Sequence, residues 1–318
     1  FGASGAEEAE PRFRRGAVFD GERELLGVVL AELSSIIESA VVERGAALMG
    51  VVNTTPDSFF DGGRYLISEA AVARVDAVLD DGATIVDIGG ESSRPRALPV
   101  PPAEQIARIT SALRHAVNRG ALVSVDTTSP EVAEFALREG ARIVNDVSCL
   151  ADPELAAVAA RAGAALILTH VRGGMSKMTG FSEWPDADYP DVVESVRADW
   201  VRARARAVQA GLAESAVWFD PGFGFAKNAA QSFELLSRLG EFTSLVPFIV
   251  VGPGRKSFIA SVDGAPPEER LGGTIAASLL AVQRGAHIVR VHDVREMRQA
   301  LAVMRAARPA PKEVQSAL

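Results

Sequence analysis

The sequence is poor in the features that mark secreted, membrane-spanning and nucleic-acid-binding proteins. Its one cysteine, Cys149, excludes an internal disulfide and is typical of a reducing compartment. No apolar run approaches the roughly 20 residues of a membrane span. Lysine and arginine total 33 against 41 acidic residues, a net charge of −8, which argues against general binding to nucleic acid or anionic membranes. The acidic start of the chain is not typical of a signal peptide. We therefore expect a cytoplasmic protein that binds neither nucleic acid nor membrane.

Length and composition are those of a globular α/β protein with one large or two ordinary domains. The chain has 318 residues, 48% of them hydrophobic and 23% charged. Over residues 25–41, apolar side chains recur at helical spacing, which predicts an amphipathic element packed on the main domain; a hairpin that closes one end of a barrel is the alternative. We predict a partly ordered extension over residues 1–46 and one domain over residues 47–318.

From residue 47 onward, short apolar runs alternate with segments of helical periodicity. This alternation is typical of parallel strands joined by right-handed crossovers. Eight such units in about 260 residues match a closed (β/α)8 TIM barrel, whereas an open doubly wound sheet would leave its edges unexplained. The predicted strands are residues 47–53, 84–89, 121–126, 142–145, 164–169, 216–220, 247–252 and 287–292, and the predicted helices are 68–81, 103–118, 129–139, 152–162, 190–211, 228–238, 270–285 and 294–306.

Each predicted strand ends in polar residues or glycine. Barrel enzymes build their sites at the carboxyl ends of the strands, and a purely structural barrel has no need of arginine, lysine and histidine there. The pattern therefore predicts an active site at this end. The residues that follow or end the runs are Asn53, Gly89-Gly90-Glu91-Ser92, Asp126, Asn145, His170, Asp220, Gly252 with the later Lys256, and Arg290-Val291-His292.

The stretch Val217–Lys227 shows this pattern most clearly. An apolar run ends in Asp220 and then breaks at Pro221, Gly222 and Gly224, which predicts a buried strand that carries Asp220 at its tip. The glycines allow the backbone to approach a ligand, and Phe223 and Phe225 offer flat apolar walls. The alternative is that Asp220 only caps the next helix.

The charges of these strand tips indicate two kinds of ligand in one barrel mouth. Carboxylates and asparagines suit a nitrogen-rich heterocycle whose N–H groups need acceptors, whereas arginine, lysine and histidine suit a phosphate or diphosphate. Mg²⁺ commonly accompanies diphosphate, and the side-chain oxygen of Asn53 suits that hard cation. A capping role for Asp126 or Asp220, and a structural role for His292, are the alternatives.

Three long loops rich in turn residues are candidates for lids over this end. They span residues 54–67, 91–102 and 171–189. Loops of this kind on the upper face of a barrel close over substrate and exclude water. Ordinary connections are the alternative.

An ordered set of motifs over residues 47–306 resembles the dihydropteroate synthase family. No single motif is specific, but their order along the chain is. They are Met49-Gly-Val-Val-Asn-Thr-Thr-Pro-Asp-Ser-Phe59, Asp61-Gly-Gly63, Asp87-Ile-Gly-Gly-Glu-Ser-Ser-Arg-Pro95, Ser124-Val-Asp-Thr127, Asn145-Asp-Val147, Asp220-Pro-Gly-Phe-Gly-Phe225, Arg255-Lys-Ser-Phe258 and Arg290-Val-His-Asp293.

The resemblance implies a TIM barrel that joins a dihydropterin bearing a CH₂-diphosphate to p-aminobenzoate in folate biosynthesis, with Mg²⁺ as cofactor. It implies catalytic roles for Asp126, Asp220, Lys256 and Arg290. Substrate contacts follow by motif: Asp126, Asn145, Asp220 and Lys256 on the pterin; Asn53 on the Mg²⁺–diphosphate; Arg94, Arg290 and His292 on the diphosphate; and Phe59, Ser93, Pro95 and Phe225 around the aminobenzoate. The family also suggests a homodimer formed through the last helices, and sensitivity to sulfonamides.

The departures from the family pattern fall on the aminobenzoate side. Gly254 stands where serine is usual, Arg96 where glycine is common and Val171 where methionine often follows the histidine. Two alternatives therefore stay open: a paralogue that binds pterin but uses another amine or only binds, and a cobalamin-type pterin methyltransferase. The cationic residues matched to diphosphate argue against the methyltransferase.

Overall fold

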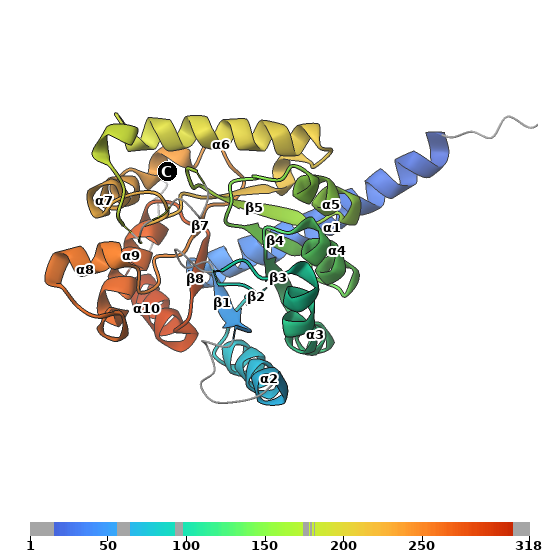
Figure 1. Cartoon of the computed structure of the whole chain (residues 1–318), viewed down its shortest axis with the longest axis horizontal. Coiled ribbons are helices and arrows are strands. Elements are labelled where there is room, and N and C mark those ends of the chain that lie inside the picture. The colour runs from blue at the N-terminus through green and yellow to red at the C-terminus, as the bar shows by residue number, and fades with distance from the viewer. Residues whose placement is uncertain are drawn as a thin grey trace, which may run out of the picture.

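The protein is a (β/α)8 barrel with an additional N-terminal helix (Figure 1). In this computed structural model the described residues are 16–55, 64–92, 98–173, 178, 180 and 182–307, with side chains left out for 16–25, 64–67 and 187. Phe59, Ser93, Arg94, Pro95 and Arg96 lie outside the described residues, as do parts of all three predicted lid loops.

Eight parallel strands form the barrel in the order β6-β5-β4-β3-β2-β1-β8-β7. The two end strands of this order meet through the bridge Phe219↔Ile249, supported by the Phe219 N–H donating to the Phe248 carbonyl at 3.0 Å. The prediction of a closed barrel is therefore confirmed. The strands are β1 Ala47–Asn53, β2 Ile85–Gly89, β3 Leu122–Asp126, β4 Ile143–Asp146, β5 Ala165–Thr169, β6 Val217–Asp220, β7 Val250–Val251 and β8 Ile288–Val291.

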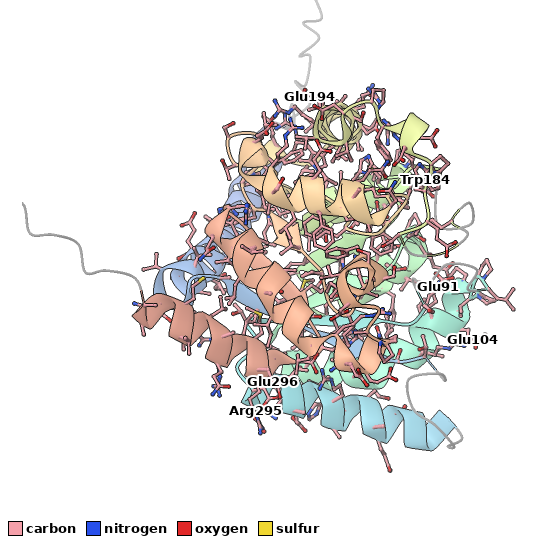
Figure 2. All side chains as sticks on the ribbon, turned by 90° about the vertical axis from the view of Figure 1, so that its left-hand side faces the viewer. Glu91, Glu104, Trp184, Glu194, Arg295 and Glu296 are labelled. Atoms are coloured by element: carbon pink, nitrogen blue, oxygen red, sulfur yellow. The ribbon has the colours of Figure 1, made fainter. Side chains whose placement is uncertain are left out.

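A ring of helices surrounds the strands, with α6 across the top of Figure 1, α3 to α5 on its right and α7 to α10 on its left. All eight predicted helices are present, and α8 is an addition that the sequence did not predict. Charged side chains such as Glu194 and Arg295 project from the outer faces (Figure 2). The helices are α1 Gly16–Arg44, α2 Arg64–Asp80, α3 Pro102–Asn118, α4 Pro130–Arg138, α5 Glu154–Ala162, α6 Val192–Gln209, α7 Ala229–Ser237, α8 Ser257–Asp263, α9 Leu271–Gln283 and α10 Val294–Ala306. No helix of the described ranges is long and apolar enough to cross a membrane.

Helix α1 closes the amino-terminal end of the barrel. Its buried residues Leu33, Ile37 and Ala40 form one apolar cluster with residues at the starts of the strands, among them Ile85 and Trp218. The helical alternative for residues 25–41 is therefore the observed one, and the helix is longer than predicted. The domain boundary after residue 46 stays a prediction, because half of α1 shares the lower core with the strands.

Two neighbouring isoleucines of α1 test how much this closure contributes. Ile37 is fully buried, whereas Ile36 is 39% exposed. We expect Ile37→Ala to lower the free energy of unfolding by about 2–5 kcal/mol through lost burial and a cavity. Ile36→Ala should cost less than about 1 kcal/mol and controls for helix propensity. Chemical denaturation of both variants measures the difference, and equal losses would mean that α1 does not seal the barrel.

Candidate active site

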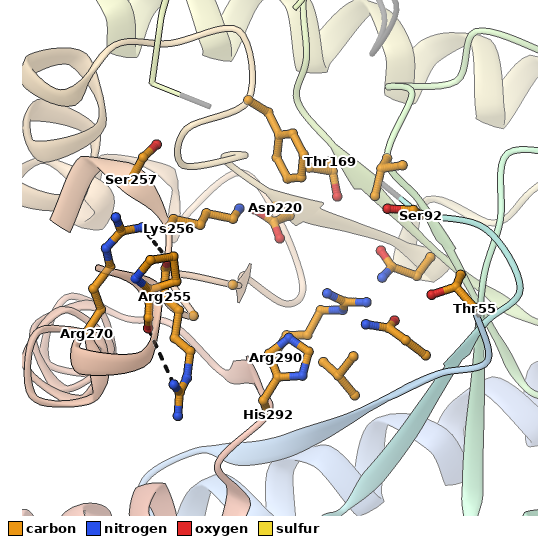
Figure 3. A pocket seen from close by; sticks show the side chains of 18 residues that line it. Thr55, Ser92, Thr169, Asp220, Arg255, Lys256, Ser257, Arg270, Arg290 and His292 are labelled. Atoms are coloured by element: carbon orange, nitrogen blue, oxygen red, sulfur yellow. Dashed lines mark hydrogen bonds between the residues drawn. The ribbon is translucent and has the colours of Figure 1, made fainter. Parts of the chain in front are cut away.

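A cavity of about 520 Å³ opens at the carboxyl ends of the strands (Figure 3), within the usual size of small-molecule sites. Lys256 points toward Asp220 on one side of it, while Arg290 and His292 lie on another side. Most of the predicted site residues that the structure describes line this cavity. The lining includes Asn53, Asn145, Thr169, Asp220, Phe225, Gly254, Arg255, Lys256, Arg270, Arg290 and His292.

Strand register brings four of the strand ends to one level. Asn53 pairs with Gly89, Gly89 with Asp126, and Asp126 with Asn145. A Cβ atom at Gly89 would lie 3.3 Å from the Asp126 Cβ, tighter than most such contacts. The glycine therefore leaves room for the Asp126 side chain, which explains why this strand ends without a side chain of its own at this level.

Arg290 is shared between two buried carboxylates. Its Nε donates to Asp87 Oδ2 and its Nη2 to Asp126 Oδ2, both at 2.7 Å. Asp126 is not among the cavity-lining residues and lies behind Arg290. Burial raises the pKa of Asp126 to about 7, against the lowering effect of Arg290. The arginine predicted to bind diphosphate is therefore already paired with the carboxylate predicted to bind pterin.

A buried lysine that does not line the cavity stabilises the turn after β6. Lys227 is fully buried, and its Nζ donates to the carbonyls of His170, Gly222 and Phe225 at 2.9–3.1 Å. Three acceptors match the three hydrogens of an ammonium group, so this geometry favours the charged form although burial lowers the pKa to about 7. Gly222 has φ +67°, and a Cβ there would lie 2.1 Å from the His170 carbonyl oxygen. The tight β6 turn thus requires both residues.

Asp220 is a strand-tip residue and not a helix cap. Its Oδ1 accepts from the Gly222 N–H at 2.7 Å, while α7 is capped by Asn228 in a capping box with Gln231. The capping alternative for Asp220 is therefore wrong. The expectation that Phe223 forms a ligand wall is wrong as well, because its ring is fully buried 5.8 Å from that of Phe258.

Lys256 and Phe225 form the wall beside Asp220. The Lys256 ammonium lies 4.0 Å from the centroid of the Phe225 ring, a cation–π contact. Burial lowers the pKa of Lys256 to about 8, and the Asp220 charge opposes this shift. Burial also raises the pKa of Asp220, opposed first by Lys256. Each charge thus helps to keep the other ionised inside the cavity.

The loop that carries Lys256 is fixed by its neighbour Arg255. That arginine has φ +53° and binds both carboxylate oxygens of Asp293, at 3.1 and 2.8 Å. Its carbonyl accepts from Arg270, and its Nη1 donates to the Pro267 carbonyl; Figure 3 marks these two bonds with dashed lines. These bonds hold the loop against the start of α10, so Lys256 is positioned by contacts on its far side.

On β5 the cavity residue is Thr169, not His170. His170 is fully buried and faces α6, where its Nε2 lies 3.1 Å from Asp199 Oδ2. Burial, then the charge of Lys227, lowers its pKa to about 3, so the imidazole is neutral. The expectation that His170 belongs to the site was therefore wrong by one residue, because neighbouring strand residues point to opposite faces.

A sequence model described as "Pterin binding enzyme" matches residues 49–292. The chain belongs to this family. The dihydropteroate synthase of Escherichia coli (strain K12) is 39% identical over 260 residues, which are 81% of this chain and 90% of that protein. Two structures of the Xanthomonas albilineans dihydropteroate synthase are similar. The one with 4-aminobenzoic acid has a TM-score of 0.77 and 38% identity, and covers 84% of this chain and 94% of its own. The one with 7,8-dihydropteroate has a TM-score of 0.73 and 36% identity, and covers 84% and 95%. The chain is thus a member of the dihydropteroate synthase family.

Among the described residues in or directly behind the cavity wall, several that are important for its geometry had no role predicted from the sequence, namely Asp87, Thr169, Arg255 and Arg270. Asp87 had a visible signal, since a carboxylate inside the apolar run Ile85–Gly89 must find a partner in the barrel. Arg255 and Arg270 had none, because their contacts depend on how the loops fold back. His292 does line the cavity, and burial, followed by the charges of Arg290 and Arg74, lowers its pKa to about 4.

Substitution of two lysines of this protein distinguishes a residue needed for stability, Lys227, from a residue needed for ligand binding, Lys256. We expect Lys227→Met to lower the free energy of unfolding by at least about 3 kcal/mol, because three buried carbonyls lose their donor. Lys256→Met should change it by less than about 1 kcal/mol, since it removes a partly desolvated charge, but should abolish ligand binding. Denaturation curves and calorimetric binding of a pterin compare the two. Equal destabilisation would contradict the separate roles.

Proposed function

We propose that the protein is a dihydropteroate synthase that condenses 6-hydroxymethyl-7,8-dihydropterin diphosphate with p-aminobenzoate and releases diphosphate. One observation carries the proposal beyond family membership: a single cavity holds acceptors for a heterocycle, Asp220 and Asn145, together with the Arg290 guanidinium and the neutral His292 imidazole as hydrogen-bond donors. A pterin and a diphosphate joined by one methylene need both within one site. Transfer of the pterinylmethyl group makes the enzyme a transferase.

The geometry supports a dissociative reaction at the methylene. Asp220 lies where its carboxylate offsets the positive charge that develops on the pterinylmethyl group, and Lys256 lies beside it on the same wall (Figure 3). Arg290 and His292 line the same cavity, and in this proposal they stabilise the negative charge that grows on the leaving diphosphate. The neutral arylamine then attacks the carbon, so no covalent enzyme intermediate is needed.

The residues present fit a magnesium ion held mainly by the substrate. The described residues contain no cluster of three or more His, Cys, Asp or Glu side chains that could hold a metal. Asn53 lines the cavity and offers a hard oxygen donor. Mg²⁺ is often held by one or two protein oxygens together with phosphate oxygens and water. Bound there with Asn53, it would neutralise charge on the leaving diphosphate.

The aminobenzoate side belongs to the same proposal but rests on fewer described residues. Val171 is buried and packs in one apolar cluster with Met178 and Phe225. Valine at this position therefore supports the ring wall that an aminobenzoate or a sulfonamide would touch. No atom of the described residues lies within 4 Å of a Cβ placed at Gly254, so this side of the cavity has room beside the glycine.

A homodimer and a cytoplasmic location complete the proposal. Leu280 on α9 and Val303 on α10 are 40% and 66% exposed, which leaves apolar side chains for a contact through the last helices. The molar mass in solution tests the dimer.

Diphosphate release tests the proposed reaction directly. With the pterin diphosphate and Mg²⁺, we expect release that depends on p-aminobenzoate and falls at least about 100-fold in Lys256→Ala, because a charge at the reacting group is lost. Arg295→Ala, altered at a side chain 73% exposed on α10, is the control and should keep full activity. Tight pterin binding without release with any arylamine would instead identify a pterin-binding paralogue.

The pKa values of Asp126 and Lys256 predict a narrow pH optimum. Below about 7, Asp126 takes up a proton and loses its acceptor charge; above about 8, Lys256 loses its proton and its positive charge. We therefore expect kcat/KM for the pterin diphosphate to rise through about pH 7 and fall through about pH 8. Lys256→Arg should move the alkaline limb upward, because guanidinium does not titrate there. A profile whose alkaline limb stays in place would assign that limb to another group.

A further inference from the structure

We propose that Asp87 sets the hydrogen-bond polarity of the pterin site: it touches no ligand, but it orients Asn145 and Arg290, which do. This assignment rests on the proposed function for the identity of the ligand. It makes Asp87 a positioning residue in the middle of β2, behind the cavity wall. The cavity-lining residues include Asn145 and Arg290 but not Asp87.

One oxygen of Asp87 holds both residues. Asp87 Oδ2 accepts from Arg290 Nε at 2.7 Å and from Asn145 Nδ2 at 3.2 Å. The Asp87 side chain is fully buried, and Asn145 is 4% exposed. Arg290 extends the chain of contacts to Asp126. Two side chains from two other strands are thus tied to the Asp87 carboxylate, and a third, Asp126, is reached through Arg290.

This contact decides which end of the Asn145 amide faces the cavity. An asparagine amide can present either its oxygen or its nitrogen, but an ionised carboxylate only accepts hydrogen bonds. Asp87 Oδ2 already accepts a hydrogen bond from the Arg290 guanidinium, which has donors only, so Asp87 faces Asn145 as an acceptor. Asn145 must therefore turn Nδ2 toward Asp87, which leaves its oxygen to accept from a ligand. The site then selects a heterocycle that offers N–H groups, as the pyrimidinone edge of a pterin does.

The remaining contacts of Asp87 argue against a purely structural role. Its Oδ1 is buried and has no hydrogen-bond partner within the described part of the chain, and the same holds for Ser124 Oγ on the neighbouring strand. Ser124 and Asp87 are partners in the β2–β3 register. A carboxylate kept for stability alone would be expected to satisfy both oxygens. Asp87 leaves one of them unpaired while its other oxygen serves two residues of the site.

Asp87→Asn tests the assignment, since it keeps the shape but no longer forces Asn145 to donate. Asp146→Asn is the matched control, because Asp146 is an equally buried carboxylate that instead accepts from Ser148 and Leu150. We expect 6-hydroxymethylpterin to bind roughly 10- to 100-fold more weakly to Asp87→Asn, the loss of an interaction through charged groups. In the control it should change less than about threefold. The KM for p-aminobenzoate should change by less than about twofold in both.

Two further readouts separate positioning from general damage. In a double-mutant cycle with Asn145→Ala, at least half of the loss caused by Asp87→Asn should disappear, because the two residues act together. The acid limb of kcat/KM should also move to lower pH, since the Asp87 charge helps to raise the pKa of Asp126. The other charged groups around Asp126, namely Arg290, Asp146 and Glu91, are unchanged in that variant. Asp146→Asn should shift the limb less, because its influence on Asp126 is smaller.

The outcomes distinguish this inference from the proposed function. A wild-type protein that binds no pterin would overturn both. Wild-type binding that Asp87→Asn leaves intact would overturn the role of Asp87 and leave the synthase standing. Equal losses in Asp87→Asn and Asp146→Asn, or full additivity with Asn145→Ala, would also overturn it. If Asp87→Asn does not fold, Asp87→Ser, which keeps an acceptor and leaves room for water, is measured against the same criteria.

Discussion

The burial of charge inside a closed barrel is the constraint on which the upper half of this structure depends. A guanidinium and two carboxylates cannot lie in a medium of low polarity unless they bind one another, because each would lose its hydration without compensation. Arg290 meets this condition by bonding to Asp87 and Asp126 at once. Two carboxylates share one guanidinium, and burial, with a smaller contribution from the Asp87 charge, still raises the pKa of Asp126 although Arg290 opposes this. The buried charges are thus held in place by one another before any ligand binds.

At the amino-terminal end of the barrel, apolar side chains rather than charged ones must be shielded from water. The inward-facing residues at this end are apolar, and α1 covers them with Leu33, Ile37 and Ala40. This closure leaves polar groups confined to the carboxyl ends of the strands, where loops and ligand can reach them. Lys227 links the two regions, since its buried ammonium braces the β6 turn that presents Asp220. The same strands therefore carry the apolar core at their amino ends and the polar residues of the cavity at their carboxyl ends.

The sequence predicted the barrel because its signals are local. Apolar runs, helical periodicity and turn residues place strands and helices within a few residues of their positions, and β1 and α10 match in full. The features that the sequence did not predict depend on the direction in which a side chain points and on contacts between residues far apart in the chain. The choice between Thr169 and His170 changes with a shift of one residue in the strand. Helix α8 follows a loop that Arg255 folds onto Asp293, which no local pattern encodes. Asp87 was visible as a charge in an apolar run, but its two partners lie on β4 and β8, far along the chain.

The same contrast between tied and untied residues distinguishes Asn145 from Gly254. On the pterin side each polar residue holds another, so a change at Asn145 removes a donor from the buried carboxylate of Asp87. Such a change costs stability and binding together. Gly254 has no comparable tie among the described residues: none of their atoms lies within 4 Å of a Cβ placed there, and its φ lies outside the left-handed region that its neighbour Arg255 adopts. Within that part of the chain, neither backbone nor packing requires glycine at this position. The residues around Asp87 are thus fixed by their own hydrogen bonds, whereas no contact of the described residues fixes the residue type at Gly254.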